Sequence, residues 1–107
     1  MAEPTLVQVF GTGATQDSSS ITIQKSALPR LTASSSNSAE SLLVGIFLAA
    51  MNYLTQTNFD ANTDQSLILG DGFSSFTTRG QTQYRLDQLT LSLAKIDTGS
   101  TINPGDY

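Results

Sequence analysis

The sequence predicts an α+β fold in which one long central helix packs on a mostly antiparallel β-sheet, with extended arms at both ends. One observation is residues 37–57 (NSAESLLVGIFLAAMNYLTQT), which carry an unbroken helical pattern. The other is that the rest of the chain consists of short β-branched or alternating apolar runs bounded by glycine and proline. A length of 107 residues suits one domain, divided into an N-terminal arm (1–4), a core (5–96) and a C-terminal arm (97–107).

The predicted helix over residues 37–57 has a marked start and an excess of apolar surface. Asn37 and Glu40 have the spacing of a capping box. Winding the helix places its small or polar side chains in one narrow column: Ser38, Ser41, Gly45, Ala49, Asn52 and Gln56. The remaining side chains are apolar over about 240°, whereas one core needs a stripe of about 100°. Strands of the same chain or a neighbouring subunit must therefore cover the surplus.

The Gly45-x-x-x-Ala49 spacing within this helix allows a second backbone to approach closely. Packing against the chain's own sheet and contact with another subunit are both compatible with it. The residues expected at such an interface are Gly45, Phe47, Ala49, Met51 and Tyr53.

Strands are predicted over residues 5–10, 19–27, 65–69, 73–78 and 82–93, the first two as a hairpin. Residues 29–36 and 58–64 are expected to be connections, and residues 70–72 and 79–80 turns. Apolar residues change parity within 82–93, so a β-bulge is expected near Asp87 and Gln88. The alternative for this last segment is an amphipathic helix through Leu86, Leu89, Leu93 and Ile96.

Composition excludes several classes of function. The net charge is −4 and the five Lys and Arg residues are scattered, which argues against nucleic-acid binding. The chain has no histidine and no cysteine, so Ser-His-Asp and Cys-His catalysis and thiolate metal sites are impossible within it. The longest apolar run, residues 42–54, is shorter than the roughly 20 residues of a membrane span. No cofactor and no membrane partner are expected.

The segment Asp97-Thr98-Gly99 resembles the active-site signature of aspartic proteases, in which a homodimer brings two aspartates together. In the retroviral family the motif comes early and a hydrophobic-hydrophobic-Gly segment follows it. Here Ile68-Leu69-Gly70 lies upstream instead, and only eight residues follow Gly99. A plain turn is the preferred interpretation, with a homodimeric aspartic protease as the alternative function.

Oxygen-bearing side chains over residues 60–71 resemble an EF-hand calcium loop. The candidate ligands are Asp60, Asn62, Asp64 and Asp71. Gln65 stands where the loop needs glycine, and Asp71 replaces the longer bidentate glutamate. A polar surface loop is therefore preferred to a metal site.

Four segments together resemble small structural proteins of tailed cyanobacterial phages and related prophages: Thr5-Leu6-Val7-Gln8-Val9-Phe10-Gly11, Ile21-Thr22-Ile23-Gln24-Lys25, Ala39-Glu40 at the start of the apolar helix, and residues 73–93. The resemblance covers about residues 6–95. It implies a non-enzymatic virion component, in the tail, baseplate or neck, that oligomerises and bridges other virion proteins after assembly in the host cytoplasm. The alternative location is the capsid surface, as a cement or decoration protein.

Overall fold

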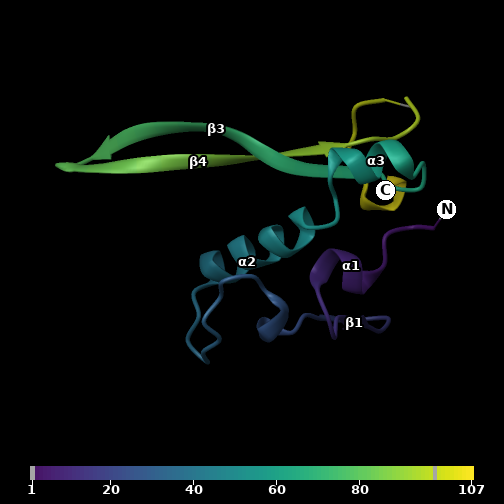
Figure 1. Cartoon of the computed structure of the whole chain (residues 1–107), viewed down its shortest axis with the longest axis horizontal. Helices are drawn as coiled ribbons and strands as arrows, with labels where there is room; N and C mark the ends of the chain where they lie inside the picture. The colour runs from purple at the N-terminus through teal and green to yellow at the C-terminus, as the bar shows by residue number, and fades with distance from the viewer. Residues whose placement is uncertain (1, 98) are drawn as a thin grey trace.

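The computed structural model describes residues 2–97 and 99–107, which form a mixed α+β chain (Figure 1). Its elements are α1 (Leu6–Phe10), β1 (Thr15–Gln16), β2 (Ile21–Thr22), η1 (Lys25–Ala27), α2 (Ala39–Met51), α3 (Gln56–Ala61), β3 (Leu67–Arg79), β4 (Thr82–Leu93) and η2 (Pro104–Asp106). The strands make two separate antiparallel pairs, β1 with β2 and β3 with β4. Among the described helices, none has the length and apolarity needed to cross a membrane.

The first element is a helix, so the strand predicted over residues 5–10 is wrong. The Thr5 hydroxyl accepts a hydrogen bond from the Gln8 backbone N–H at 3.1 Å, and the Gln8 side chain accepts one from the Thr5 N–H at 2.9 Å. This reciprocal capping box satisfies two backbone donors of a short helix and offsets the β propensity of Val7 and Val9.

Replacing Thr5 by alanine removes this cap and is expected to lower the free energy of unfolding by about 1 kcal/mol. Urea denaturation followed by circular dichroism measures the change. The matched control is Thr12→Ala, because Thr12 is exposed in the turn after α1. Equal midpoints for the two variants would show that the cap does not hold α1.

The second predicted strand, residues 19–27, is also mostly wrong. Within it only Ile21 and Thr22 form a strand, and they pair with Gln16 and Thr15 rather than with residues 5–10. The turn between β1 and β2 is closed by the Asp17 carboxylate, which accepts hydrogen bonds from the Ser19 and Ser20 N–H groups at 2.8 and 2.9 Å. These bonds lower the pKa of Asp17.

The single helix predicted over residues 37–57 is corrected to two shorter helices. Ser38 rather than Asn37 caps α2, by accepting from the Ser41 N–H at 3.1 Å. The helix ends at Met51, and Thr55 then caps α3. The chain must turn here because Leu54 is buried and its carbonyl accepts the Leu69 N–H at 2.8 Å.

Strands β3 and β4 form one long two-stranded ribbon. The predicted turn at residues 79–80 is present, since Gly80 takes a φ of 63° in the two-residue loop between Arg79 and Thr82. The turn predicted at residues 70–72 is wrong, and so is the helix alternative over 86–96, because both segments lie largely within the ribbon.

A bulge does occur where the parity change predicted it, but the extra residue lies on β3. Two residues, Gly72 and Phe73, stand opposite Gln88 between the Asp71–Leu89 and Ser74–Asp87 pairs. A Cβ on Gly72 would lie 3.0 Å from the Gln88 Cβ and 3.1 Å from the Gln88 carbonyl oxygen, so this close approach favours glycine. Of the two glycines that suggested a turn, Gly72 therefore belongs to the bulge, whereas Gly70 pairs regularly with Thr90.

The core is small and lies where the base of the ribbon meets α2. Its buried members are Ala50, Leu54 and Leu69, with Val9, Phe47, Met51, Tyr53 and Leu67 packed around them. Gln65, also buried, donates hydrogen bonds to the Thr55 and Leu67 carbonyls at 3.1 and 2.8 Å. The core thus anchors one end of the ribbon and leaves the other end free.

Both predicted arms are tied to this same end of the molecule, where the two termini lie near α3 (Figure 1). The Asn62 side chain donates to the Ala2 carbonyl at 2.8 Å. Lys95 Nζ donates to the Thr101 carbonyl at 2.7 Å and lies 3.4 Å from Asp106 Oδ2. The terminal segments therefore fold back onto the chain rather than extending away from it.

Candidate interaction surface

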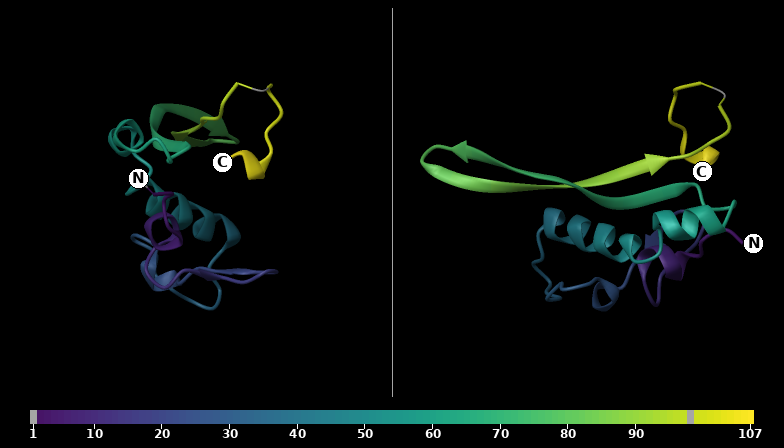
Figure 2. Two further views of the ribbon diagram at one scale, coloured as in Figure 1. Left: turned by 90° about the vertical axis from the view of Figure 1, so that its right-hand side faces the viewer. Right: turned by 45° about the horizontal axis from the view of Figure 1, so that its top comes forward.

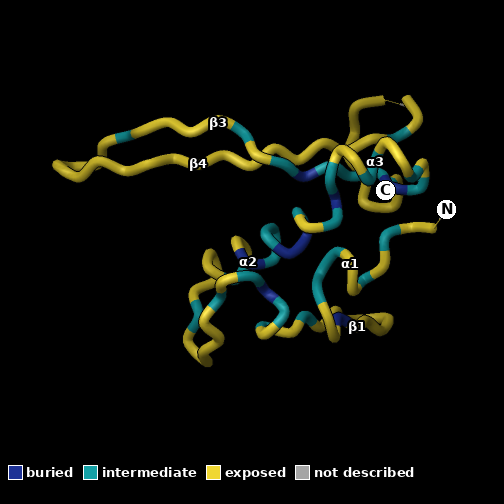
Figure 3. The backbone as a smooth tube through the Cα atoms, viewed as in Figure 1, coloured by how far each residue is buried: buried dark blue, intermediate teal, exposed yellow. Residues whose placement is uncertain are grey.

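The most conspicuous surface is the β3–β4 ribbon, which projects well beyond the helices (Figure 2). Every residue of β4 is exposed, and so is β3 from Phe73 to Phe76. Along most of its length the ribbon has neither face covered (Figure 3). Within the described chain, the ribbon thus lacks the third strand or the packed helix that normally covers a sheet. A two-stranded ribbon without such cover is at best marginally stable in water.

The whole molecule exposes far more surface than a compact chain of its mass. Its accessible surface is 7857 Å², whereas a compact 11.4-kDa monomer exposes about 5,800 Å². Its radius of gyration is 16.1 Å, against about 13 Å for a compact domain of this length. The excess of about 2,000 Å² exceeds the roughly 800 Å² that each partner buries in a standard protein interface.

Much of the exposed ribbon surface is apolar. Near the base, Leu89, Leu91 and Leu93 share one face, while near the tip Tyr84 and Leu86 lie on the opposite face. The bulge separates these two halves, and the strands cross midway along the ribbon (Figure 1). Phe73 is 85% exposed and Phe76 63%, so neither aromatic ring is packed within the described chain. Together with the exposed leucines, these rings make the ribbon surface largely apolar, and extended apolar patches mark contact sites.

The outer half of the ribbon, from the bulge to the tip, also carries ordered charges. Arg85 Nε donates to Asp87 Oδ1 at 2.7 Å, and both side chains hydrogen-bond to Ser74 Oγ. The bond from Arg85, followed by that from Ser74, lowers the pKa of Asp87. On the other face, the Arg79 guanidinium lies 4.3 Å from the centre of the Tyr84 ring. These pairs fix charged groups beside exposed apolar ones.

The structure places the predicted interface residues of α2 mostly inside the chain. Gly45 and Ala49 are buried, and a Cβ on Gly45 would lie 3.1 Å from the Leu28 Cβ. Phe47, Met51 and Tyr53 pack against the core. A role for these five residues in subunit contact stays a prediction.

The surplus apolar surface of α2 is located elsewhere on the helix. Leu43 is 51% exposed and Val44 54%. Sequence reasoning missed these two residues as contact candidates, along with those of the ribbon. The signal for the ribbon was the parity change in residues 82–93, combined with aromatic residues on both faces of residues 73–78.

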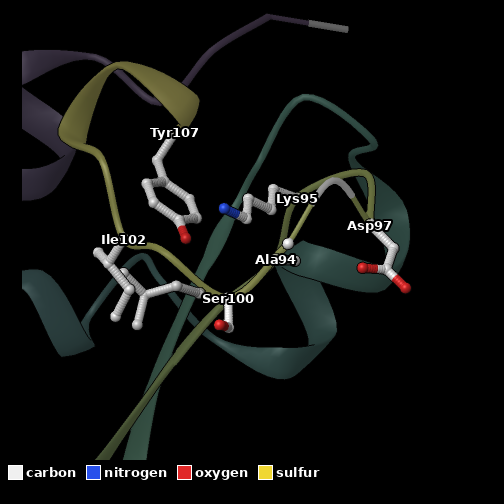
Figure 4. Close-up of a pocket in the computed structure, with 8 residues that line it drawn as sticks. Ala94, Lys95, Asp97, Ser100, Ile102 and Tyr107 are labelled. Atoms are coloured by element: carbon white, nitrogen blue, oxygen red, sulfur yellow. The ribbon is translucent and has the colours of Figure 1, made fainter.

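The Asp97-Thr98-Gly99 motif can be placed only in part, because Thr98 lies outside the described residues. Asp97 and Gly99 help to line an open hollow of about 350 Å³ near the C-terminus. Figure 4 shows the Asp97 carboxylate directed away from Tyr107, while the Lys95 amine points toward the Tyr107 ring. That amine is engaged by the C-terminal segment, so the hollow is better described as a packing defect beside a folded tail.

The four calcium candidates do not form one site. Asp60 lies in α3 and accepts a hydrogen bond from Gln56, whereas Asp71 lies in β3 opposite Leu89. The Asn62 side-chain oxygen accepts the Asp64 N–H at 3.0 Å, as in a local turn. Over residues 2–97 and 99–107, no three acidic side chains gather where they could hold a metal ion.

Comparison with known proteins found no match to this chain, whether among family models, curated proteins or solved structures.

Proposed function

We propose that this chain is a non-enzymatic structural protein of a tailed phage particle. In this role it oligomerises and bridges other virion subunits, as a tail, baseplate or neck component. The observation that carries the proposal is the long ribbon with exposed apolar residues on both strands. The resemblance of residues 6–95 to small phage structural proteins supplies the kind of particle.

The ribbon supports an assembly role because the isolated chain cannot bury it. The buried apolar residues are few: Ala14, Leu28, Ala49, Ala50, Leu54 and Leu69. Neighbouring subunits would add strands to the open edges of the ribbon and cover its apolar faces, which is the usual chemistry of β-strand addition. An assembled form would then gain the burial that the single chain lacks.

Light scattering on the purified chain at micromolar concentration tests this role. We expect a mass that is a multiple of 11.4 kDa, because contacts between copies bury the ribbon. A shortened variant, with residues 71–89 replaced by an Asn-Gly turn joining the paired residues Gly70 and Thr90, is expected to be monomeric. A wild-type monomer would count heavily against the proposal.

The shortened variant needs a control for folding, because loss of the ribbon tip must not be confused with loss of the core. The core contacts at Leu54 and Leu69 lie below the deleted part and are expected to persist. Far-ultraviolet circular dichroism should therefore retain its helical signal. A second control, Gln81→Ala in the exposed loop between β3 and β4, leaves the ribbon at full length and should oligomerise like the wild type.

A further inference from the structure

The two edges of the ribbon differ in how well they are protected. The edge of β3 is covered at its base, where the Leu69 N–H bonds to the Leu54 carbonyl, and is interrupted by the bulge at Gly72 and Phe73. The edge of β4 has neither feature, and no segment of residues 2–97 or 99–107 pairs with it. It contains no proline and no lysine, which are common protections of free edges. β4 is therefore the strand most ready to accept a neighbour.

The backbone geometry restricts how two copies of β4 can pair. The Leu69 N–H points away from β4, so its cross-strand partner Leu91 also directs its backbone groups outward, as do the other odd-numbered residues of β4. In an antiparallel pair of β4 strands, odd residues must face odd residues. One residue of β4 must therefore face its own copy across the two-fold axis, and we name the axis by that residue.

Charge then selects one position for that axis. An axis at Arg85 or at Asp87 would set two like charges opposite each other. An axis at Tyr84 or Gln88 would leave both charges opposite uncharged residues. An axis at Leu86 brings Arg85 of each copy opposite Asp87 of the other, so two favourable pairs form. Among the five registers with an axis at residues 84 to 88, only the one at Leu86 sets opposite charges across from each other.

We infer that a second copy of this chain pairs with β4, antiparallel and about a two-fold axis at Leu86. The product is a four-stranded sheet in the order β3-β4-β4-β3. The inference rests on the proposed assembly role and specifies one homotypic contact within it. A sheet of three or more strands can be stable where a two-stranded ribbon is not.

Both faces of the paired strands fit this register. On one face, Arg85 uses two of its donors on Asp87 and Ser74 of its own chain, and the guanidinium keeps others for Asp87 of the second copy. On the opposite face, Leu86 meets its own copy, flanked on each side by Tyr84 opposite Gln88. The Leu86–Leu86 contact at the axis therefore has a Tyr84–Gln88 pair on each side.

Single cysteines test the register directly, because the chain contains none of its own. Facing residues in an antiparallel pair lie about 4.5–5.5 Å apart at Cα, within the range of a disulfide. Leu86→Cys is expected to shift from the monomer to the dimer position on a non-reducing gel after mild oxidation. Tyr84→Cys and Gln88→Cys are matched controls on the same face, and each should stay monomeric alone.

A mixture of these two control variants is a positive control for crosslinking in the same register. Position 84 lies about 13 Å, or four residues, from its own copy but directly opposite position 88 of the second chain. Mixing Tyr84→Cys with Gln88→Cys should therefore yield a crosslinked dimer of one chain of each kind. Self-crosslinking of either control as fast as Leu86→Cys would overturn the register.

Charge exchange gives an independent readout. Arg85→Asp and Asp87→Arg each create like-charge contacts across the axis and should weaken dimerisation by about tenfold, whereas the double variant restores both pairs and should recover it. If light scattering shows oligomers while Leu86→Cys fails to crosslink, the β4 contact is wrong and the assembly role stands. A wild-type monomer would overturn both.

Discussion

Replacing Leu69 by alanine is expected to lower the free energy of unfolding by about 2–4 kcal/mol. Leu69 is 5% exposed, and with Ala50 and Leu54 it forms the buried centre of the small core. Truncation leaves a cavity where the ribbon joins the helices, and few other contacts hold these parts together. Urea denaturation monitored by circular dichroism measures the loss.

Leu91 supplies a matched control, because it is the cross-strand partner of Leu69 and the same residue type. It is 46% exposed, so Leu91→Ala should lower the free energy of unfolding of the monomer by less than about 1 kcal/mol. The comparison must be made at a concentration where the chain is monomeric. Equal losses for the two variants would show that Leu69 is not a core residue, and that the ribbon is not anchored as described.

At the start of the chain, two local signals predict different structures: β propensity predicts a strand, and a capping box predicts a helix. Thr5 to Phe10 is rich in β-branched and apolar residues, which led to a predicted strand. The Thr5 and Gln8 pair carried the opposite signal, a capping box, and in the structure it wins. No strand of the described chain lies beside residues 5–10 to form hydrogen bonds with an extended segment, so the local hydrogen bonds of the cap determine the conformation.

The end of α2 depended on information that no local pattern contains. The apolar run continues through Leu54, so periodicity alone extends the helix. In the structure, the Leu54 carbonyl is instead used by the Leu69 N–H, a contact across fifteen residues of sequence. Thr55 was the available local signal, since it caps α3 by accepting the Asn58 N–H.

The sequence predicted that the chain has uncovered apolar surface, but it did not predict where most of that surface lies. The excess of apolar residues correctly indicated that part of the chain lacks cover, and α2 does expose Leu43 and Val44. The larger uncovered surface lies on the ribbon, where the change of parity at residues 86–89 predicts a bulge or an amphipathic helix but not an uncovered face. Alternation specifies two faces of a strand, but it does not tell whether a third strand or a helix covers either of them.

Replacing Gly45 by leucine is expected to lower the free energy of unfolding by about 3 kcal/mol, because α2 packs closely on the connection before it. A Cβ at Gly45 would already lie 3.1 Å from Leu28 Cβ and 3.2 Å from Leu28 Cδ1, and Leu28 is itself buried. The further atoms of leucine would have to displace this side chain or separate the two segments, which is costly in a packed site. Thermal or urea denaturation checks the change.

Three comparisons separate overpacking at Gly45 from a general effect of substitution in α2 and α3. Gln56→Ser, at an exposed position of α3, is expected to be tolerated. Gly45→Ala adds only the close Cβ and gains about 1 kcal/mol of helix propensity, so its net effect should be near zero. In a Leu28→Ala background the cost of Gly45→Leu should fall, since Leu28 Cγ and Cδ1, which the leucine would strike, are removed while the Cβ at 3.1 Å remains. If Gly45→Leu costs the same with and without Leu28, the close contact is not what requires glycine, and the column of small residues on α2 has no packing role at this position.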